Sequence, residues 1–349
     1  MSSPRGSSPK AAPDKPPTME DVAAKAGVSR ALVSLVMRNS PKVSDGRRKA
    51  VLQAADSLGY RPNALARNLA SEQTHAIGVV INDLHNPYFV EVLDGMEPVV
   101  SRHGYRLLVM PGWQDRHREA AAIETLLEYR VDGIVLAGPQ LGPEVIDRTA
   151  AVTPVVTVGM SHPTPAFDSV NNNEMVGARL AIDHLTSLGH RSITHVDGGK
   201  GAGAAERKAG YLQAMDATGL ASHTQVIPGD FTAAAGTQAA VQLIASQQRP
   251  TAVFAANDLC AAGILDAFQH AGVRVPCDIS VIGYDNTGLA AMPQLSLSTI
   301  NQPRPEMGAL AVEALLDRLQ QSRQVARHVV LDPTLVARRT TGPATSPSP

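Results

Sequence analysis

The chain has 349 residues, which is enough for two or three domains with buried cores. Its two cysteines are too few for a disulfide scaffold, which indicates a reducing cytoplasm rather than secretion. No stretch approaches the roughly 20 apolar residues of a membrane span, and residues 1–17 lack the apolar core of a signal peptide.

The net charge of −1 hides an asymmetry along the chain. Residues 1–75 hold 12 Lys and Arg against 6 Asp and Glu, a net charge of +6. The rest of the chain holds 19 against 26, a net charge of −7. A basic N-terminal part followed by an acidic body suits a polyanion that binds at one end of the molecule.

Both ends of the chain are rich in proline and serine. Residues 1–17 and 341–349 are therefore predicted to be disordered tails. The C-terminal tail carries no leucine heptad, so nothing in it indicates a tetramer.

Residues 18–38 have the pattern of two short helices joined by a tight turn. Thr18 is a predicted N-cap with Asp21 at the reciprocal capping-box position. Gly27 ends the first helix, because a C-terminal cap needs a left-handed residue, and Ser29 caps the second. Helix, glycine turn and helix predict a helix-turn-helix, whose second helix enters the DNA major groove.

A third helix is predicted from a cap at Ser44 to Leu58, with Gly59 as its stop. In the second helix Arg30, Ala31 and Ser34 share the face opposite the apolar stripe, which makes them candidate DNA contacts. An αα-hairpin that only packs against the rest of the chain is the alternative interpretation.

Four blocks then point to a known family. They are DVAAKAGVS, VS, GYRPNALARNLA and IGVVINDLHNPYF. Their order and spacing resemble the lactose-repressor/galactose-repressor (LacI/GalR) family of transcriptional regulators. The resemblance implies a DNA-binding domain at 18–62 and a hinge helix with a linker at 63–75. It also implies that the hinge forms on operator DNA, paired with its copy in a dimer, and that Leu69 is a wedge between base steps.

The predicted DNA contacts follow from the outer face of the second helix and from the family resemblance. They are Thr18, Ser29, Arg30, Ala31, Ser34, Leu35, Arg38, Lys42, Asn63, Ala66 and Leu69. The second helix departs from the common family pattern, because Leu32, Leu35 and Arg38 stand where Thr, Arg and Asn are usual. Leu35 cannot hydrogen-bond guanine but can touch a thymine methyl, so an unusual operator half-site is expected.

From Ala76 onward, short apolar runs alternate with helical patterns. The runs are 76–81, 105–110, 131–138, 154–159, 192–196, 225–227, 251–256 and 279–283. The helical patterns lie around 87–103, 118–130, 175–188, 205–218, 232–246, 259–271 and 304–321. Four strand–helix units followed by four more predict an α/β body of two doubly wound parallel-sheet subdomains.

This architecture resembles that of periplasmic sugar-binding proteins. The predicted body spans 76–340. Its N-subdomain takes about 76–170 and 303–331, and its C-subdomain takes about 171–300 and 332–340, so the chain crosses between them several times. The last long helix is expected to return to the first subdomain.

Ligands of open α/β sheets bind beyond the carboxyl ends of the strands. Asp83, Tyr88 and Phe89 follow the first strand of the body, and polar and aromatic residues follow several others. The family resemblance implies ligand contacts at further positions. The predicted effector site is Asp83, Tyr88, Phe89, Asn172, Arg207, Phe231, Asn257, Asp285 and Gln302.

A glycine-rich stretch at 199–204 fits a permissive dinucleotide fingerprint, which makes a nucleotide-dependent oxidoreductase a competing hypothesis. However, no acidic residue ends the next strand to hold a ribose. No catalytic or metal signature is present, so neither an enzyme nor a cofactor is predicted. A cytoplasmic small-molecule-binding protein with a degenerate DNA head is the other alternative.

The sequence therefore predicts a ligand-responsive transcriptional regulator, most simply a repressor. It is expected to act in the cytoplasm at the nucleoid and to bind a near-palindromic operator as a homodimer. A sugar or a related polar metabolite is expected in the body. Which effector this is, and whether it releases or promotes DNA binding, stay open.

Overall fold

The computed structural model describes residues 17–38, 40–61, 73–160, 162, 164–323 and 325–344. The chain forms two compact units, Met1–Thr74 and His75–Pro349. The predictions of a disordered N-terminal tail and of a hinge helix at 63–70 lie outside the described residues.

The N-terminal unit, the head, contains α1 (Met19–Ala26), α2 (Arg30–Met37) and α3 (Asp45–Leu58). The predicted capping box is present: Thr18 Oγ1 accepts a hydrogen bond from the Asp21 amide, and Asp21 Oδ2 accepts one from the Thr18 amide. Gly27 ends α1 at a φ of 63°, where a side chain would be strained. Ser29 Oγ caps α2 by accepting from the Leu32 amide at 3.2 Å.

Ser44 differs from its prediction. It occupies the N-cap position of α3, but its side chain makes no capping hydrogen bond. The three helices of the head pack around a small apolar core. The buried members of that core are Val22, Ala23, Val33, Val36, Val43, Val51, Ala54 and Ala55.

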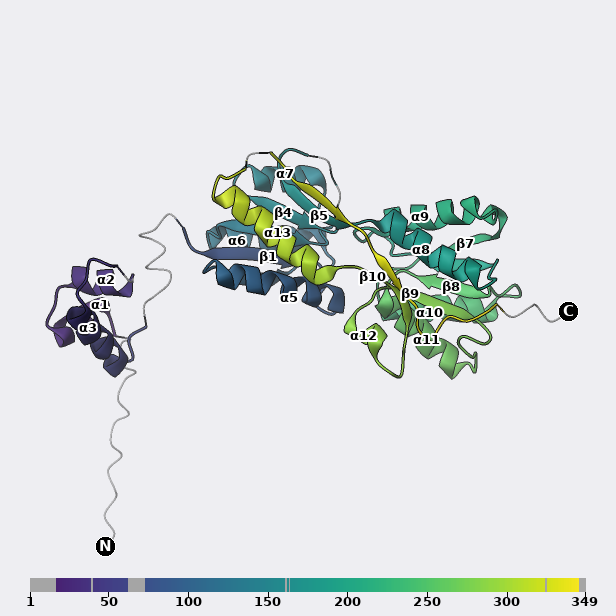
Figure 1. The fold of residues 1–349 in the computed structure, drawn as a ribbon, viewed down its shortest axis with the longest axis horizontal. Helices are drawn as coiled ribbons and strands as arrows, with labels where there is room; N and C mark the ends of the chain where they lie inside the picture. Colours follow the sequence, from purple (N-terminus) through teal and green to yellow (C-terminus); the bar gives the residue numbers. More distant parts are fainter. Residues whose placement is uncertain are drawn as a thin grey trace, which may run out of the picture. The chain divides into compact units, whose positions relative to one another are not determined.

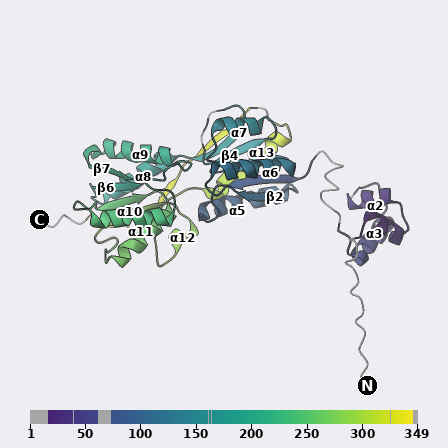
Figure 2. The same cartoon turned by 180° about the vertical axis from the view of Figure 1, so that it is seen from behind.

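The body contains two six-stranded sheets (Figures 1 and 2). The first has the order β11-β5-β4-β3-β1-β2 and is parallel throughout. Its strands are β1 (Ala76–Ile81), β2 (Arg106–Pro111), β3 (Gly133–Ala137), β4 (Val155–Val158), β5 (Asp168–Asn172) and β11 (His328–Leu331). Its helices are α5 (Pro87–Arg102), α6 (Arg116–Glu128), α7 (Pro143–Ala150) and α13 (Arg304–Leu319).

The second sheet has the order β12-β10-β9-β8-β6-β7, with β12 antiparallel to β10. Its strands are β6 (Ile193–Val196), β7 (Thr224–Ile227), β8 (Ala252–Ala255), β9 (Ser280–Asp285), β10 (Ser298–Asn301) and β12 (Thr334–Val336). Its helices are α8 (Glu174–Ser187), α9 (Ala204–Ala217), a 3₁₀ turn (Ala221–His223), α10 (Ala233–Ala245), α11 (Asp258–His270) and α12 (Gly288–Ala291).

The two parallel-sheet subdomains and the return of α13 to the first of them are confirmed. The chain crosses between the sheets after β5, before α13 and between β11 and β12 (Figure 1). Four strands, β5, β10, β11 and β12, and the helices α7 and α12 were not predicted. Residues 341–344, assigned by sequence to a disordered tail, bond to the second subdomain: the Ala344 amide donates to the Leu188 carbonyl at 2.8 Å.

Helices α5 and α13 cross with their backbones in contact and lie side by side on one face of the first sheet (Figure 1). A Cβ added at Gly95 would lie 1.9 Å from the Pro305 carbonyl oxygen, and one at Gly308 would lie 1.9 Å from that of Val92. This crossing therefore requires glycine on both helices.

Candidate functional site

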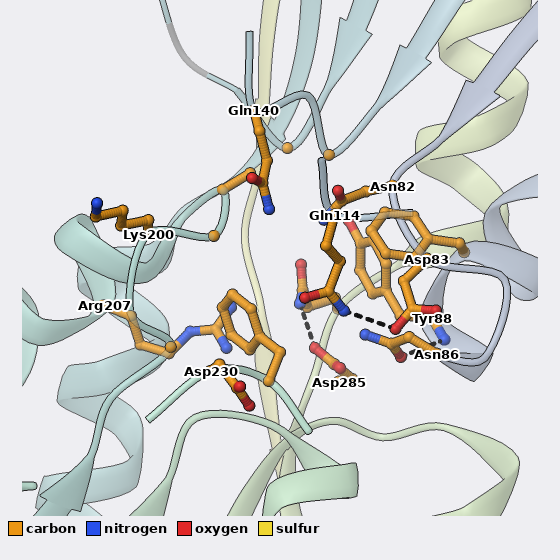
Figure 3. Close-up of a pocket in the computed structure, with 18 of the residues that line it drawn as sticks. Asn82, Asp83, Asn86, Tyr88, Gln114, Gln140, Lys200, Arg207, Asp230 and Asp285 are labelled. Carbon is orange, nitrogen blue, oxygen red and sulfur yellow. Dashed lines mark hydrogen bonds between the residues drawn. The ribbon is translucent and has the colours of Figure 1, made fainter. Parts of the chain in front are cut away.

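A cavity of about 220 Å³ lies between the two sheets, where the carboxyl ends of their parallel strands meet. Seven residues of the predicted effector site line it: Asp83, Tyr88, Phe89, Arg207, Phe231, Asp285 and Gln302. They come from loops and helix starts that follow β1, β6, β7 and β10, and from the last residue of β9. Figure 3 shows side chains of both subdomains pointing toward the same space.

The wall from the first subdomain is built on the start of α5. Asn86 Oδ1 caps this helix by accepting from the Tyr88 amide at 3.0 Å, and the Tyr88 and Phe89 rings meet edge to face with centroids 5.0 Å apart. Gln114 Nε2 donates to Asp83 Oδ2 at 2.8 Å and so joins the loop after β2 to the loop after β1. Burial raises the pKa of Tyr88, so its hydroxyl stays a neutral donor.

The loop after β2 also holds an unusual backbone. Trp113 and the neighbouring Gln114 have φ values of 56° and 54°, a conformation that costs free energy for residues other than glycine. The Trp113 side chain is exposed, and its ring lies 5.9 Å from that of His85. The geometry places Gln114 against Asp83 and leaves Trp113 at the surface.

Arg207, in the first turns of α9, is the buried cation of the wall from the second subdomain. Its Nε and Nη2 donate to Glu174 Oε2 at 2.9 and 2.8 Å. Its Nη1 donates to the Ala256 carbonyl oxygen, and its guanidinium lies 3.6 Å from the centre of the Tyr284 ring. Despite burial, the pKa of Arg207 is raised, because the Glu174 carboxylate favours its charged form.

Phe231 accounts for one glycine of the glycine-rich stretch, Gly201, and for Gly198 just before it. A Cβ added at Gly198 or at Gly201 would lie 2.4 Å from the Phe231 ring. These glycines make room for an aromatic side chain of the pocket, which is a different use from the close approach of a pyrophosphate that the dinucleotide fingerprint requires.

Asp285 ends β9 at a φ of 106°, and its Oδ1 accepts from Gln302 Nε2 at 2.6 Å (Figure 3). Burial raises the pKa of the Asp285 carboxyl, with Arg207 acting in the opposite direction and the carboxyl of Asp258 raising it further. Asp258 itself accepts from the Thr287 amide at 2.7 Å and from Thr299 Oγ1 at 2.6 Å, and it does not line the cavity.

Two predicted effector residues do not line the cavity. Asn257 caps α11 by accepting from the Cys260 amide at 2.8 Å, and its Nδ2 donates to the Phe231 carbonyl at 3.1 Å. Asn172 Nδ2 donates to Tyr284 Oη at 2.7 Å. Asn257 thus supports the pocket residue Phe231 from behind, and Asn172 holds Tyr284, whose ring lies against the Arg207 guanidinium.

Sequence reasoning missed several residues of the lining. They include Asn82, Asn86, Gln114, Gln140, Glu174, Lys200 and Asp230. Glu174 follows a strand that was not predicted. The other six follow predicted strands, so the rule of strand ends could have found them.

In the head, the predicted contacts of α2 are placed as follows. Arg30 is exposed, and its Nε lies 3.0 Å from Glu20 Oε1. Ala31 is exposed as well, while Ser34 and Leu35 are half-buried. Arg38 is exposed, and its Nε donates to the Ser34 carbonyl at 3.3 Å.

The other predicted DNA contacts lie outside α2. Thr18 and Ser29 are occupied as caps, and Lys42 is exposed. Asn63, Ala66 and Leu69 lie outside the described residues. Among the described residues no helix is long and apolar enough to cross a membrane.

The comparisons with known proteins cover both units. The family profile of bacterial regulatory proteins, lacI family, matches residues 18–63. The profile of a periplasmic binding protein-like domain matches residues 182–341.

Similar proteins cover nearly the whole chain. The HTH-type transcriptional repressor PurR of Photobacterium profundum is 35% identical and covers 92% of this chain and 98% of its own. The ribose operon repressor of Haemophilus influenzae is 34% identical and covers 92% and 97%. A crystal structure of the lac repressor dimer bound to operator and an anti-inducer is 30% identical, with a TM-score of 0.84 and coverage of 94% and 100%.

A helix-turn-helix head and a body of two parallel sheets around a cavity define a DNA-binding transcriptional regulator of the periplasmic-binding-protein-like class. The chain belongs to the LacI family of bacterial regulatory proteins. This family consists of DNA-binding regulators and not of enzymes, so the oxidoreductase hypothesis is wrong.

Proposed function

We propose that the protein represses transcription by binding a near-palindromic operator as a homodimer, and that a small polar effector in the cavity changes its operator affinity. Two-fold symmetry of a dimer places one head on each half-site. The capped helices and filled core of the head argue against a degenerate DNA-binding domain. The site of action is the cytoplasm, at the nucleoid.

The single observation that carries the proposal is the composition of the cavity wall. Asp83 and Tyr88 belong to the first subdomain, whereas Arg207 and Asp285 belong to the second. A ligand that contacts both walls has different affinities for different arrangements of the two subdomains. Only such a difference in affinity lets an effector shift a protein between two states.

The effector site comprises the nine predicted residues, with Asn172 and Asn257 in supporting positions, together with Gln114, Gln140 and Glu174. Amide, carboxyl and guanidinium groups beside aromatic rings suit a polyhydroxylated ligand. A relative named as a ribose operon repressor supports a sugar or a related metabolite.

The proposal is tested by a gel shift with DNA from upstream of the gene, combined with a thermal-shift screen of sugars, polyols and nucleosides. A ligand at a hundred times its Kd adds about 2.7 kcal/mol to the free energy of unfolding. A ligand that raises the Tm and also changes the gel shift supports the proposal. Failure of the full-length protein to bind any upstream fragment specifically would contradict it.

Arg30→Ala is expected to relax base preference at one position in each half-site. A bidentate pair of arginine with guanine discriminates by about 1–3 kcal/mol. The exposed pair with Glu20 is weak enough to be exchanged for DNA. Selection from a random-site library measures the preference, and Lys25→Ala, which removes a charge from α1, is the matched control. An equally sharp motif after Arg30→Ala would reduce Arg30 to an electrostatic contact.

Leu69→Ala is expected to weaken specific operator binding and to straighten the DNA, with the Tm unchanged. The reason is chemical: an apolar wedge opens a base step at a cost of a few kcal/mol, which the closer contact of a bent duplex offsets. Nonspecific binding rests on phosphate contacts and should barely change. A circular-permutation assay measures the bend, and an unchanged bend angle rules out the wedge.

A further inference from the structure

The guanidinium of Arg207 is largely occupied before any ligand arrives. Arginine has five N–H donors, and three of them already donate: two to Glu174 Oε2 and one to the Ala256 carbonyl. One face of the guanidinium is covered by the Tyr284 ring. Two N–H groups therefore remain for a ligand in the cavity, and a carboxylate or phosphate that accepts from them must share the guanidinium with the Glu174 carboxylate.

The charge of Arg207 is neutralised at the same point. The Arg207 side chain is 4% exposed and that of Glu174 is 13% exposed, so water screens their attraction little. Both residues line the cavity. An anionic ligand must either displace the Glu174 carboxylate from Arg207 or lie beside it, and both are unfavourable.

The remaining charges of the described cavity wall do not favour an anion. Asp285 on the wall from the second subdomain and Asp83 on the opposite wall are both acidic residues. Lys200 and Asp230 are both exposed at the second subdomain's side (Figure 3), so this wall carries an acidic side chain as well as the lysine.

Neutral hydroxyl groups, in contrast, find many partners. Asn82, Gln114, Gln140 and Gln302 bring amides that both donate and accept. The volume of about 220 Å³ is below the roughly 300–1,000 Å³ of pockets for drug-sized molecules, so the ligand is small.

We propose that the cavity selects a small, neutral, polyhydroxylated ligand over its phosphorylated or acidic counterparts, and that Glu174 sets this selectivity by occupying the guanidinium of Arg207. This inference rests on the proposed function of the cavity as an effector site. Glu174 is the first residue of α8, so its backbone is held by a helix of the second subdomain.

The test compares matched pairs of probes: ribose, glucose, adenosine and guanosine, each with its phosphate ester. Calorimetry on the full-length protein gives the affinities, and a gel shift gives the effect on operator binding. We expect the wild type to bind the neutral member of at least one pair, at least tenfold more tightly than its phosphate ester. Glu174→Gln should shift that ratio at least tenfold toward the ester.

Two further variants keep the test decisive. Glu174→Asp retains the charge and should restore the preference for the neutral probe. Glu206→Gln removes an exposed charge from the first turn of α9, outside the cavity, and should leave the ratio unchanged. If Glu174→Gln does not fold, the ratio of the wild-type affinities for the neutral probe and its phosphate ester still tests the proposed selectivity.

The failures of the two proposals are distinguishable. A wild type that binds a phosphate ester more tightly than its neutral partner, or a ratio that Glu174→Gln does not change, overturns the inference but leaves the effector site standing. If no probe binds the wild type or alters its operator affinity, the proposed effector site fails, and the inference fails with it.

Discussion

Arg207→Ala is expected to weaken effector binding at least a hundredfold while operator binding without effector stays unchanged. Each hydrogen bond to a charged group contributes about 1.5–3 kcal/mol, and Arg207 has two N–H groups left for the ligand. The substitution also leaves the Ala256 carbonyl and the Glu174 carboxylate without their partner. The Tm of the body should therefore fall as well, because the structure shows Arg207 to be part of the wall itself.

Calorimetry with the effector found by screening, and gel shifts with and without it, measure the two effects separately. Arg179→Ala is the matched control, because Arg179 is an exposed arginine of α8 that does not line the cavity. The head has its own core and is expected to bind DNA as before. An effector affinity within threefold of the wild type would remove Arg207 from the site.

Gly308→Ala is expected to lower the free energy of unfolding of the body by about 3 kcal/mol or more, the upper end of overpacking effects. The added Cβ would lie 1.9 Å from the Val92 carbonyl oxygen, and that atom belongs to a helix backbone and cannot rotate away. For a domain of this size each kcal/mol lowers the Tm by about 2–4 °C. A thermal melt should therefore show a decrease of about 6–12 °C.

Gly288→Ala is the control for this prediction, because a Cβ at Gly288 meets no atom within 4 Å. An equal Tm for Gly308→Ala and the wild type would mean that α5 and α13 separate at little cost.

The crossing of α5 and α13 also matters for the effector site. Helix α13 begins at Arg304, which binds Glu91 of α5 at 2.8 Å and follows Gln302 of the cavity closely. A displaced α13 should therefore weaken effector binding too.

The elements that sequence reasoning found are those whose signals are local. Apolar runs such as 76–81 predict buried parallel strands, and Thr18, Gly27 and Ser29 mark helix ends through their own side chains or φ values. Strand β5 escaped because its sequence is polar although it is fully buried. Asp168 in β5 is satisfied by Arg318 and Arg323, which are 150 and 155 residues away in sequence, so no local pattern could reveal it.

Strand β10 escaped for a similar reason. The side-chain hydroxyls of its buried Ser298 and Thr299 find partners in Thr341 and Asp258, respectively. In both strands the polar side chains find their hydrogen-bond partners only in the folded chain. Local hydrophobicity along the sequence therefore underestimates how deeply these strands are buried.

In the candidate site, too, local sequence signals identified some residues and missed those that depend on the folded chain. Asp83 and Phe231 were found because parallel strands bring their carboxyl ends to one edge. Glu174 was missed together with its strand. Asn257 follows a strand as predicted, but it is used as a helix cap, because an asparagine at a helix start can bond the exposed amides. Sequence position therefore places a residue near a cleft without deciding whether its side chain faces the ligand or the helix.

Trp113 is the only tryptophan of the chain. It is 45% exposed, and its neighbour Gln114 lines the cavity. Because Gln114 is bonded to Asp83, a ligand that rearranges these two side chains should also move the loop that carries the indole. The emission of a single indole depends on its contact with water, and no second tryptophan in the head adds background. The fluorescence of Trp113 in the unlabelled protein can therefore be used to follow the occupancy of the cavity while the head is bound to DNA.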